Sequence, residues 1–343
     1  MKSHSEQDGG NGPAKGLDAG GVAIVAVTRE VPGSLAIHVP GVRVELRPGP
    51  LERMTRAALL EHVRGAHVIV SMFSDRVDAE MLDAAGPQLR GVCNLAVGFE
   101  NIDLKECARR GVAVSNTPNA VTEGTADLAW MLILAVARRL IEGDEFARSG
   151  AWERHGPLSM SQFLGLDLTG RTLLIVGAGR IGYATALRSL GWGMQVLYTA
   201  RSRHWEFELA PLAARRVELD EGLRAADVVS IHTPLTDQTR HLIGERELSL
   251  LKPTAILVNT SRGPVVDEDA LVRALEAKQL WGAGLDVFEH EPRVHEGLRR
   301  MKNVVMMPHV GSAATKYRAM MTEMVSENAS AMLAGREPPN RVV

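Results

Sequence analysis

The chain has 343 residues, which is enough for two domains that each bury a hydrophobic core. Its 39 Lys and Arg residues nearly balance its 41 Asp and Glu residues, so its charge supports neither a nucleic acid nor a membrane surface as a partner. The two cysteines, Cys93 and Cys107, have the spacing of neither a metal site nor a disulfide framework. We therefore predict no metal site and expect a reducing compartment, the cytoplasm.

The first part of the chain alternates between strand-like and helix-like segments. Residues 1–20 are polar and rich in glycine, and we expect them to form a disordered leader. After them, the apolar runs that predict strands are residues 22–28, 42–46, 66–72, 89–95 and 112–115, with helical patterning over 54–64 and 79–85. This alternation is typical of an α/β domain with a parallel sheet.

A long helix is predicted next, from about Glu123 to Glu145. It is apolar on nearly all sides between Ala129 and Ala137, and a helix of that kind must be buried on several faces. A helix that crosses between domains or lies in a subunit interface meets this requirement. The longest apolar run, residues 128–137, is too short to span a bilayer.

A second α/β series follows the long helix. Its predicted strands are residues 171–176, 194–198, 227–231, 254–258, 281–287 and 304–307. A final helix over 316–333 would return the chain to the first domain and make that domain discontinuous. We therefore expect one domain of residues 21–118 plus 316–343 and a second domain of residues 119–315.

The second series begins with a glycine motif between a strand and a helix. Gly177, Gly179 and Gly182 are spaced G-x-G-x-x-G directly after the apolar run 173–176. In such a turn the first glycine allows the sharp bend, the second lets a pyrophosphate approach the backbone, and the third lets the helix pack on the strand. The N-terminus of the helix then favours the phosphates. This context predicts a dinucleotide-binding domain.

The end of the next strand indicates which dinucleotide is bound. An NAD site places an acidic residue there, about 20 residues after the motif, to bond the ribose 2′-hydroxyl. This chain has Arg201, Ser202 and Arg203 at that point, and no carboxylate between Gly182 and Glu206. These side chains can bind a 2′-phosphate, so we predict NADP(H) in preference to NAD(H). The alternative is a solvated basic turn.

Three charged residues follow later strands, where open parallel sheets bind ligands. Arg262 can hold a carboxylate through two parallel hydrogen bonds, and Glu291 with His309 can form an acid–base pair. A carboxylate beside an imidazole selects its tautomer and favours the protonated form. Each residue alone is more often structural or in a surface ion pair. Together, downstream of a dinucleotide turn, they indicate catalysis.

At these residues the chain resembles the D-isomer-specific 2-hydroxyacid dehydrogenases, from about Val22 to Met332. The motifs that carry the resemblance are residues 97–103, 116–118, 176–182, 259–263, 285–292 and 308–312. The resemblance implies an α/β fold of two Rossmann- or flavodoxin-like domains with parallel sheets. It also implies that the discontinuous domain binds the substrate and the other domain binds the dinucleotide. The active site would lie in the cleft between these two domains.

The resemblance also implies roles for individual residues. Arg262 would bind the substrate carboxylate and carbonyl, and His309 would be the proton donor in reduction, with Glu291 as its partner. Glu289 is a rival for Glu291, but the glutamate of the family directly precedes a proline, as Glu291 does. The backbone of Val97 and Gly98 would contact the substrate. The residues that would contact the cofactor are Thr125, Arg180, Ile181, His232, Thr233, Pro234, Thr260, Ser261, Asp286 and Gly311.

Within the family the chain is most similar to the glyoxylate/hydroxypyruvate reductases, which implies reduction of a small 2-oxoacid to the D-2-hydroxyacid. It also implies a homodimer formed through the 123–145 helix and the arm after it. Members of that group often carry a second tryptophan in this arm, whereas here only Trp152 is present. The choice of 2-oxoacid therefore stays open.

Other functions remain as alternatives. A phosphoglycerate-type or other D-2-hydroxyacid dehydrogenase has the same motifs but often an added regulatory domain. A formate dehydrogenase is disfavoured because that branch pairs its histidine with glutamine. A dinucleotide-sensing corepressor of the same fold would not be an enzyme.

Overall fold

The computed structural model describes residues 21–343, so the predicted leader lies outside the described residues. The chain divides into two units. Unit 1 contains the described residues up to Ala120 together with Thr315–Val343, and unit 2 is Val121–Ala314. The expected boundaries therefore lie within two residues of the observed ones. The final helix does belong to the first unit.

Unit 1 is built on a parallel sheet of five strands among the described residues, in the order β2-β1-β3-β4-β5. The strands are β1 (Val22–Val27), β2 (Arg43–Arg47), β3 (Val68–Ser71), β4 (Gly91–Asn94) and β5 (Ala113–Ser115). β3 and β4 are buried throughout, as expected for apolar runs in a sheet that is covered on both faces.

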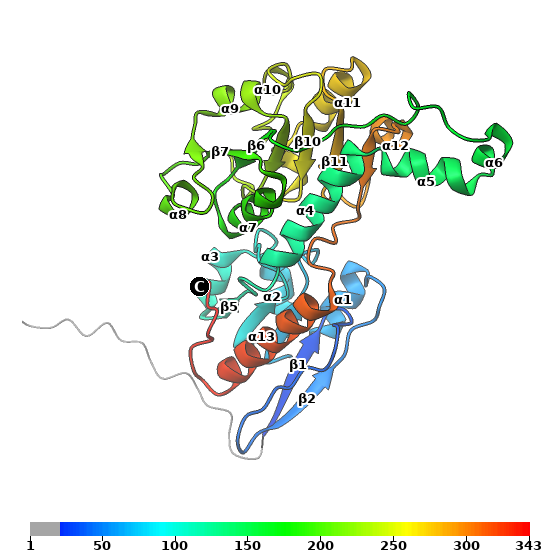
Figure 1. The fold of residues 1–343 in the computed structure, drawn as a ribbon. Helices are drawn as coiled ribbons and strands as arrows, with labels where there is room; N and C mark the ends of the chain where they lie inside the picture. The colour runs from blue at the N-terminus through cyan, green and yellow to red at the C-terminus, as the bar shows by residue number, and fades with distance from the viewer. Residues whose placement is uncertain (1–20) are drawn as a thin grey trace, which may run out of the picture. The chain divides into compact units, whose positions relative to one another are not determined.

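The helices of unit 1 are α1 (Arg56–His62), α2 (Ala79–Ala85), α3 (Leu104–Arg110) and α13 (Thr315–Leu333). Met81 and Leu82 of α2 and Cys107 of α3 join one hydrophobic core with Ile69 and Val92 of the sheet. Helix α13 lies along the sheet and contacts β3, β4 and β5 (Figure 1).

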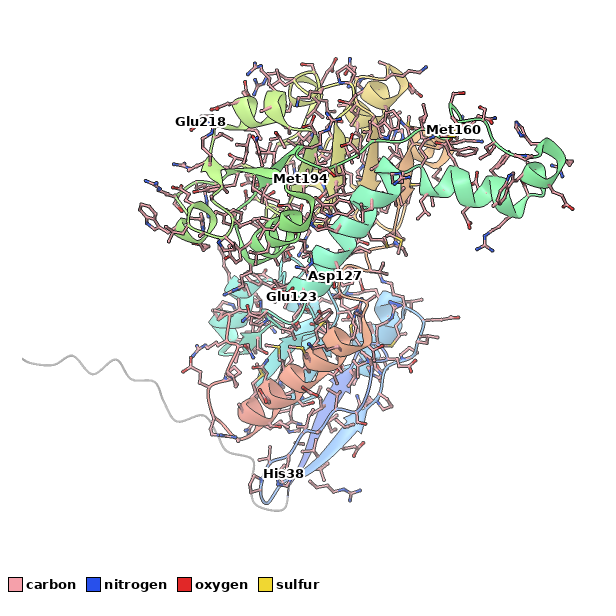
Figure 2. All side chains as sticks on the ribbon, in the orientation of Figure 1. His38, Glu123, Asp127, Met160, Met194 and Glu218 are labelled. Atoms are coloured by element: carbon pink, nitrogen blue, oxygen red, sulfur yellow. The ribbon has the colours of Figure 1, made fainter. Side chains whose placement is uncertain are left out.

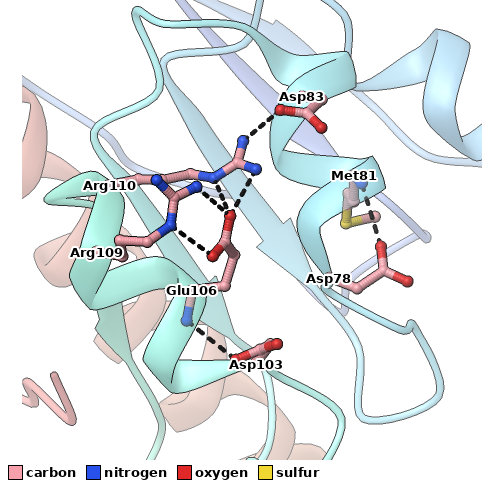
Figure 3. A network of polar contacts seen from close by, with 7 residues as sticks. All are labelled: Asp78, Met81, Asp83, Asp103, Glu106, Arg109 and Arg110. Carbon is pink, nitrogen blue, oxygen red and sulfur yellow. Dashed lines mark hydrogen bonds and ion pairs between the residues drawn. The ribbon is translucent and has the colours of Figure 1, made fainter.

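Charged side chains join α2 and α3 at the surface (Figure 3). Both Arg109 Nε and Arg110 Nε donate to the carboxylate of Glu106, at 2.8 and 2.7 Å, and Arg110 Nη1 also donates to Asp83 at 2.6 Å. Hydrogen bonds from the two arginines lower the pKa of Glu106 to about 2. Asp103 caps α3 by accepting from the Glu106 N–H group.

We expect the Glu106 network to make the stability of the protein depend on pH. A carboxyl whose pKa falls on folding stabilises the fold above its usual value of 4.5, and this contribution is lost as the pH falls towards 2. Urea unfolding should therefore show that E106Q lowers the free energy of unfolding at pH 7 but not near pH 2. An equal loss at both pH values would contradict this linkage.

Unit 2 has a parallel sheet of seven strands among the described residues, in the order β12-β11-β10-β9-β6-β7-β8. The strands are β6 (Thr172–Val176), β7 (Gln195–Thr199), β8 (Arg215–Arg216), β9 (Val228–Ile231), β10 (Ile256–Asn259), β11 (Gly282–Leu285) and β12 (Val304–Met306). From β6 the chain first adds β7 and β8 on one side of the sheet and then β9 to β12 on the other side. A ligand site is therefore expected at the carboxyl ends of β6 and β9, where the direction of strand addition changes.

Unit 2 also contains helices. They are α4 (Thr122–Ala137), α5 (Leu140–Arg148), α6 (Ala151–His155), α7 (Arg180–Arg188), α8 (Trp205–Glu208), α9 (Leu219–Ala225), α10 (Glu245–Leu248), α11 (Glu268–Glu276) and α12 (Glu296–Arg300), with short 3-10 turns at Ser189–Trp192 and Gly263–Val265. No helix of the described residues is long and apolar enough to cross a membrane.

The prediction of one helix from Glu123 to Glu145 is wrong, because the chain forms α4 and then α5. The carbonyl of Ala137 accepts from Leu166 N at 2.8 Å, outside the helix ladder. Arg139 adopts a left-handed conformation with φ of 53°. Its guanidinium pairs with Glu142 and lies 5.4 Å from the centre of the Phe163 ring. Apolar periodicity continues across the break and does not reveal it.

Helix α4 is buried on several faces, as predicted, and packs against β10, β11 and α7. Helices α5 and α6 instead project away from the rest of unit 2 (Figure 1). We call residues 140–164 the arm. Figure 2 shows Met160 on the arm, where its side chain is 95% exposed.

Candidate active site

The glycine motif forms the turn between β6 and α7. Gly177 has a φ of 102°, and a Cβ there would lie 2.8 Å from the carbonyl carbon of His232. A Cβ at Gly182 would lie 2.3 Å from the Gly177 oxygen, whereas at Gly179 it would meet no atom within 4 Å. Gly179 is the N-cap of α7 and no side chain caps this end. The turn thus leaves open backbone where a phosphate can approach.

Unpaired polar atoms lie beside this turn and directly after β10. His232 Nδ1, Thr233 Oγ1 and Thr260 Oγ1 are buried side-chain atoms without a hydrogen-bond partner among the described residues. Burial lowers the pKa of His232 to about 3, so its ring is neutral, and Nε2 lies 2.8 Å from Ser230 Oγ. Buried polar atoms normally have partners, so these groups fit the polar edge of a bound dinucleotide.

The basic turn after β7 is held by a carboxylate. Arg203 Nε donates to Glu208 Oε2 at 2.6 Å, and the guanidinium lies 3.9 Å from the centre of the Trp205 ring. Tyr198 Oη donates to Glu208 Oε1 at 2.7 Å. Both oxygens of Glu208 therefore have partners, and hydrogen bonds from Arg203 and then Tyr198 lower its pKa. Glu208 is already occupied and is poorly placed to take a ribose hydroxyl as well.

Arg201 differs from Arg203 in its surroundings. Its side chain and that of Ser202 are exposed, and its backbone carbonyl accepts from Arg216 Nη2 at 3.3 Å. Arg216 Nη2 also donates to the Ala200 carbonyl at 2.9 Å, so this arginine fixes the backbone of the turn. Arg201 therefore presents its guanidinium from an anchored backbone.

His309 and Glu291 form the predicted pair. His309 Nδ1 lies 2.8 Å from Glu291 Oε2, and Glu291 Oε1 accepts from Phe288 N at 3.0 Å. Burial alone would raise the pKa of Glu291, but the hydrogen bond and charge of His309, then the hydrogen bond from Phe288 N and the charge of Arg262, lower it overall. Because Nδ1 faces the carboxylate, a proton transfer by this ring would use its other nitrogen, Nε2.

Glu289 has a different partner. Its Oε1 lies 2.6 Å from His241 Nε2, and its backbone N donates to Glu268 Oε1 at 2.6 Å. Burial, and then the charge of Glu289, raise the pKa of Glu268 even though this hydrogen bond opposes them. The geometry thus separates the two rival glutamates, with Glu291 on His309 and Glu289 on His241.

Asp286 holds the loop that carries His309. Its backbone carbonyl accepts from His309 N at 2.8 Å, and its two carboxylate oxygens accept from Val310 N and Gly311 N at 2.8 and 2.9 Å. These bonds retain His309 in a left-handed conformation with φ of 54°. Burial raises the pKa of Asp286 to about 6. A Cβ at Gly311 would also lie 3.2 Å from Thr125 Oγ1, which places Thr125 at the same loop.

Arg262 follows β10 and begins the turn Gly263–Val265. Asn259 Nδ2 donates to the Arg262 carbonyl at 3.0 Å, and Asn259 Oδ1 accepts from both N and Oγ of Ser261. A Cβ at Gly263 would lie 1.9 Å from the Phe288 carbonyl, so only glycine lets this turn pack against the loop of Glu291. Close packing of these two loops brings Arg262 towards the His309–Glu291 pair.

Comparison with known proteins identifies the family of this chain. A family model described as D-isomer specific 2-hydroxyacid dehydrogenase, NAD binding domain, matches residues 130–311. The chain belongs to this family. It is 48% identical over 323 residues to a protein named glyoxylate reductase from Thermococcus gammatolerans, covering 93% of this chain and 95% of that protein.

Solved structures of other proteins have the same fold as this dehydrogenase. The TT0316 protein of Thermus thermophilus has a TM-score of 0.86 and 43% identity, covering 93% of this chain and all of that one (100%). An NADPH-dependent glyoxylate/hydroxypyruvate reductase of Sinorhizobium meliloti, in complex with NADP and malonate, has a TM-score of 0.78 and 32% identity, covering 94% and 97%.

Reasoning from the sequence missed several contacts of this dehydrogenase. It did not identify Glu208 as the partner of Arg203, nor the pair of His241 and Glu289. His241 had no signal in the sequence because its glutamate is 48 residues away. For Arg203 the signal was present, since Glu208 lies only five residues further along the chain.

Proposed function

We propose that this dehydrogenase reduces a small 2-oxoacid to the D-2-hydroxyacid with NADPH. The observation that carries the proposal is the contact between His309 Nδ1 and Glu291 at 2.8 Å, in the same unit as Arg262 and the glycine turn. Relatives at 44–48% identity that are named glyoxylate reductase support the substrate class.

In this proposal Arg262 and the N–H groups of Val97 and Gly98, on a loop of unit 1, bind the substrate carboxylate. When bound, NADPH supplies the hydride for the carbonyl carbon. His309 holds a proton on Nε2 and delivers it to the carbonyl oxygen, while Glu291 keeps the ring in that orientation and stabilises its protonated form. Orientation and proton transfer lower the barrier together.

The preference for NADPH over NADH is part of the proposal. It is supported by the exposed Arg201 and Ser202, by the absence of an available carboxylate on the described turn, and by the NADP in the Sinorhizobium meliloti enzyme. Gly177, Gly179, Gly182 and the start of α7 (Arg180, Ile181) would bind the pyrophosphate. We propose that the unpaired atoms of His232, Thr233 and Thr260 line the rest of this site, along with Pro234, Ser261, Asp286, Gly311 and Thr125.

Steady-state rates on a panel of 2-oxoacids with NADPH and NADH test the proposal. We expect kcat/KM to be higher with NADPH and higher for hydroxypyruvate or a longer polar 2-oxoacid than for glyoxylate. The reason for the size preference is that residues 159–161 of the arm offer two serines and a flexible methionine where related reductases carry a bulky indole. No turnover of any 2-oxoacid would refute the function, and glyoxylate as the best substrate would refute only the size preference.

We also propose that the protein is a cytoplasmic homodimer that associates through α4 and the arm. The arm exposes Trp152, Met160 and Leu164, at 53%, 95% and 61%, and exposed apolar groups on a projecting segment are suited to a second copy of the chain. Light scattering should give twice the mass of one chain, whereas the mass of a single chain would contradict the dimer.

A further inference from the structure

The loop after β4 contains Val97 and Gly98, and its carbonyl groups are bound one after another. Ala96 O accepts from Thr117 N at 2.9 Å. Val97 O accepts from Asn116 Nδ2 at 2.7 Å, and Gly98 O accepts from Asn94 Nδ2 at 2.8 Å. Because a carbonyl can only accept, each asparagine must present its NH₂ group to the loop.

These bonds fix the direction of the N–H groups. A trans peptide is planar, so the N–H of one residue points opposite to the carbonyl of the residue before it. Asn116, which binds the Val97 carbonyl, therefore sets the direction of the Gly98 N–H. In the same way, the bond from Thr117 N to the Ala96 carbonyl sets the direction of the Val97 N–H. In the described part of the chain neither N–H has an acceptor.

Both asparagines are themselves held firmly. Asn94 is fully buried at the end of β4, and its Oδ1 accepts from Ser71 Oγ at 3.0 Å. The backbone of Asn116 is bound on both sides, since its N donates to Asn340 O at 3.2 Å and its O accepts from Asn328 Nδ2 at 3.4 Å. The returning C-terminal segment thus helps to place Asn116.

Folding alone does not require these two side-chain bonds. Val97 and Gly98 are half-exposed, so water could satisfy their carbonyls if the asparagines were absent. The bond from Thr117 N would still attach the loop to the segment after β5. Asn116 adds a fixed orientation of the Gly98 N–H, which is what a donor needs in order to meet a carboxylate without reorganising.

We propose that Asn116 is a positioning residue that holds the Gly98 N–H ready for the substrate carboxylate, while Asn94 anchors the next carbonyl of the same loop. This inference rests on the proposed function and deepens it. Neither asparagine touches the substrate, and each acts through the backbone carbonyl that it binds.

The test is a set of variants at Asn116, with oxamate as a non-reacting 2-oxoacid analogue. N116D has the same shape but places a carboxylate oxygen against the Val97 carbonyl, so it repels the loop, whereas N116A lets water replace the amide. Calorimetry of the NADPH-loaded protein should show oxamate binding about 10-fold weaker or more in N116D and less affected in N116A. NADPH affinity should stay within about twofold, and KM for the 2-oxoacid should rise more than kcat falls.

Gln88 provides a matched control in the same unit. Its Nε2 donates to the carbonyls of Ala66 and Ala85 before β3 and β4, at the ends of the strands opposite the loop. Q88E makes the same amide-to-acid exchange and should lower the melting temperature without changing oxamate binding.

If N116D lowers only the melting temperature, Asn116 is merely structural and the inference fails. If the wild type binds no oxamate and reduces no 2-oxoacid, the proposed function fails instead. Should N116D not fold, unchanged oxamate binding in N116A would overturn the inference.

Discussion

Replacing His309 with alanine is expected to lower kcat for 2-oxoacid reduction at least about 100-fold, the usual contribution of a general acid. NADPH affinity should change little, because the imidazole donates a proton rather than binding the cofactor. Stopped-flow measurement of a single turnover with excess NADPH would show that the chemical step itself is slow. A loss confined to KM would instead mean that His309 only binds the substrate.

The partner of His309 should be visible in the pH profile. In E291Q the charge that favours the imidazolium form is removed, so the fall in kcat/KM for reduction with rising pH should begin at lower pH. E289Q is the matched control, since Glu289 lies two residues away and pairs with His241 at 2.6 Å. Its profile should match that of the wild type. A shift in E289Q and none in E291Q would reverse the assignment.

Replacing Arg201 with alanine is expected to lower kcat/KM for NADPH about 10- to 100-fold and to leave the value for NADH nearly unchanged. The reason is the loss of charge-assisted hydrogen bonds to the 2′-phosphate, which NADH lacks. Replacing both Arg201 and Arg203 should reduce the value further. Binding of 2′,5′-ADP and 5′-ADP, measured by calorimetry, isolates the phosphate contact from catalysis.

Arg215 supplies the control for this experiment. It is an exposed arginine near the same turn, on β8, and its Nη1 donates to Glu221 at 2.7 Å. R215A should weaken 2′,5′-ADP and 5′-ADP equally or not at all. A wild type that already prefers NADH, or an R201A variant that loses both nucleotides equally, would exclude a 2′-phosphate site at Arg201.

The strands could be predicted from the sequence because each is a short apolar run bounded by polar or turn residues. The predicted segment 66–72 contains β3, and 89–95 contains β4. By contrast, β8 has only two residues, Arg215 and Arg216, both exposed, and nothing apolar indicates it. The break between α4 and α5 was also missed, because it depends on Leu166 N taking the Ala137 carbonyl from a distant part of the chain.

The chemistry of the site was predictable where it is written in local motifs. The three glycines, the residues after β10 and the Glu-Pro and Pro-His pairs each lie in one short segment. Their mutual arrangement was not predictable, because His309 and Glu291 come from different loops and the orientation of His309 depends on three hydrogen bonds to Asp286.

The α/β class, the family and the residue types that the site requires could all be predicted from the sequence, since periodicity and turn chemistry are local properties. Three findings required the folded structure: Glu291 is the glutamate that meets His309, Glu208 binds Arg203, and Asn94 and Asn116 bind the Val97–Gly98 loop. These are contacts between groups brought together by sheet order and close packing. Their strength depends on distances of about 3 Å, which residue spacing along a chain does not specify.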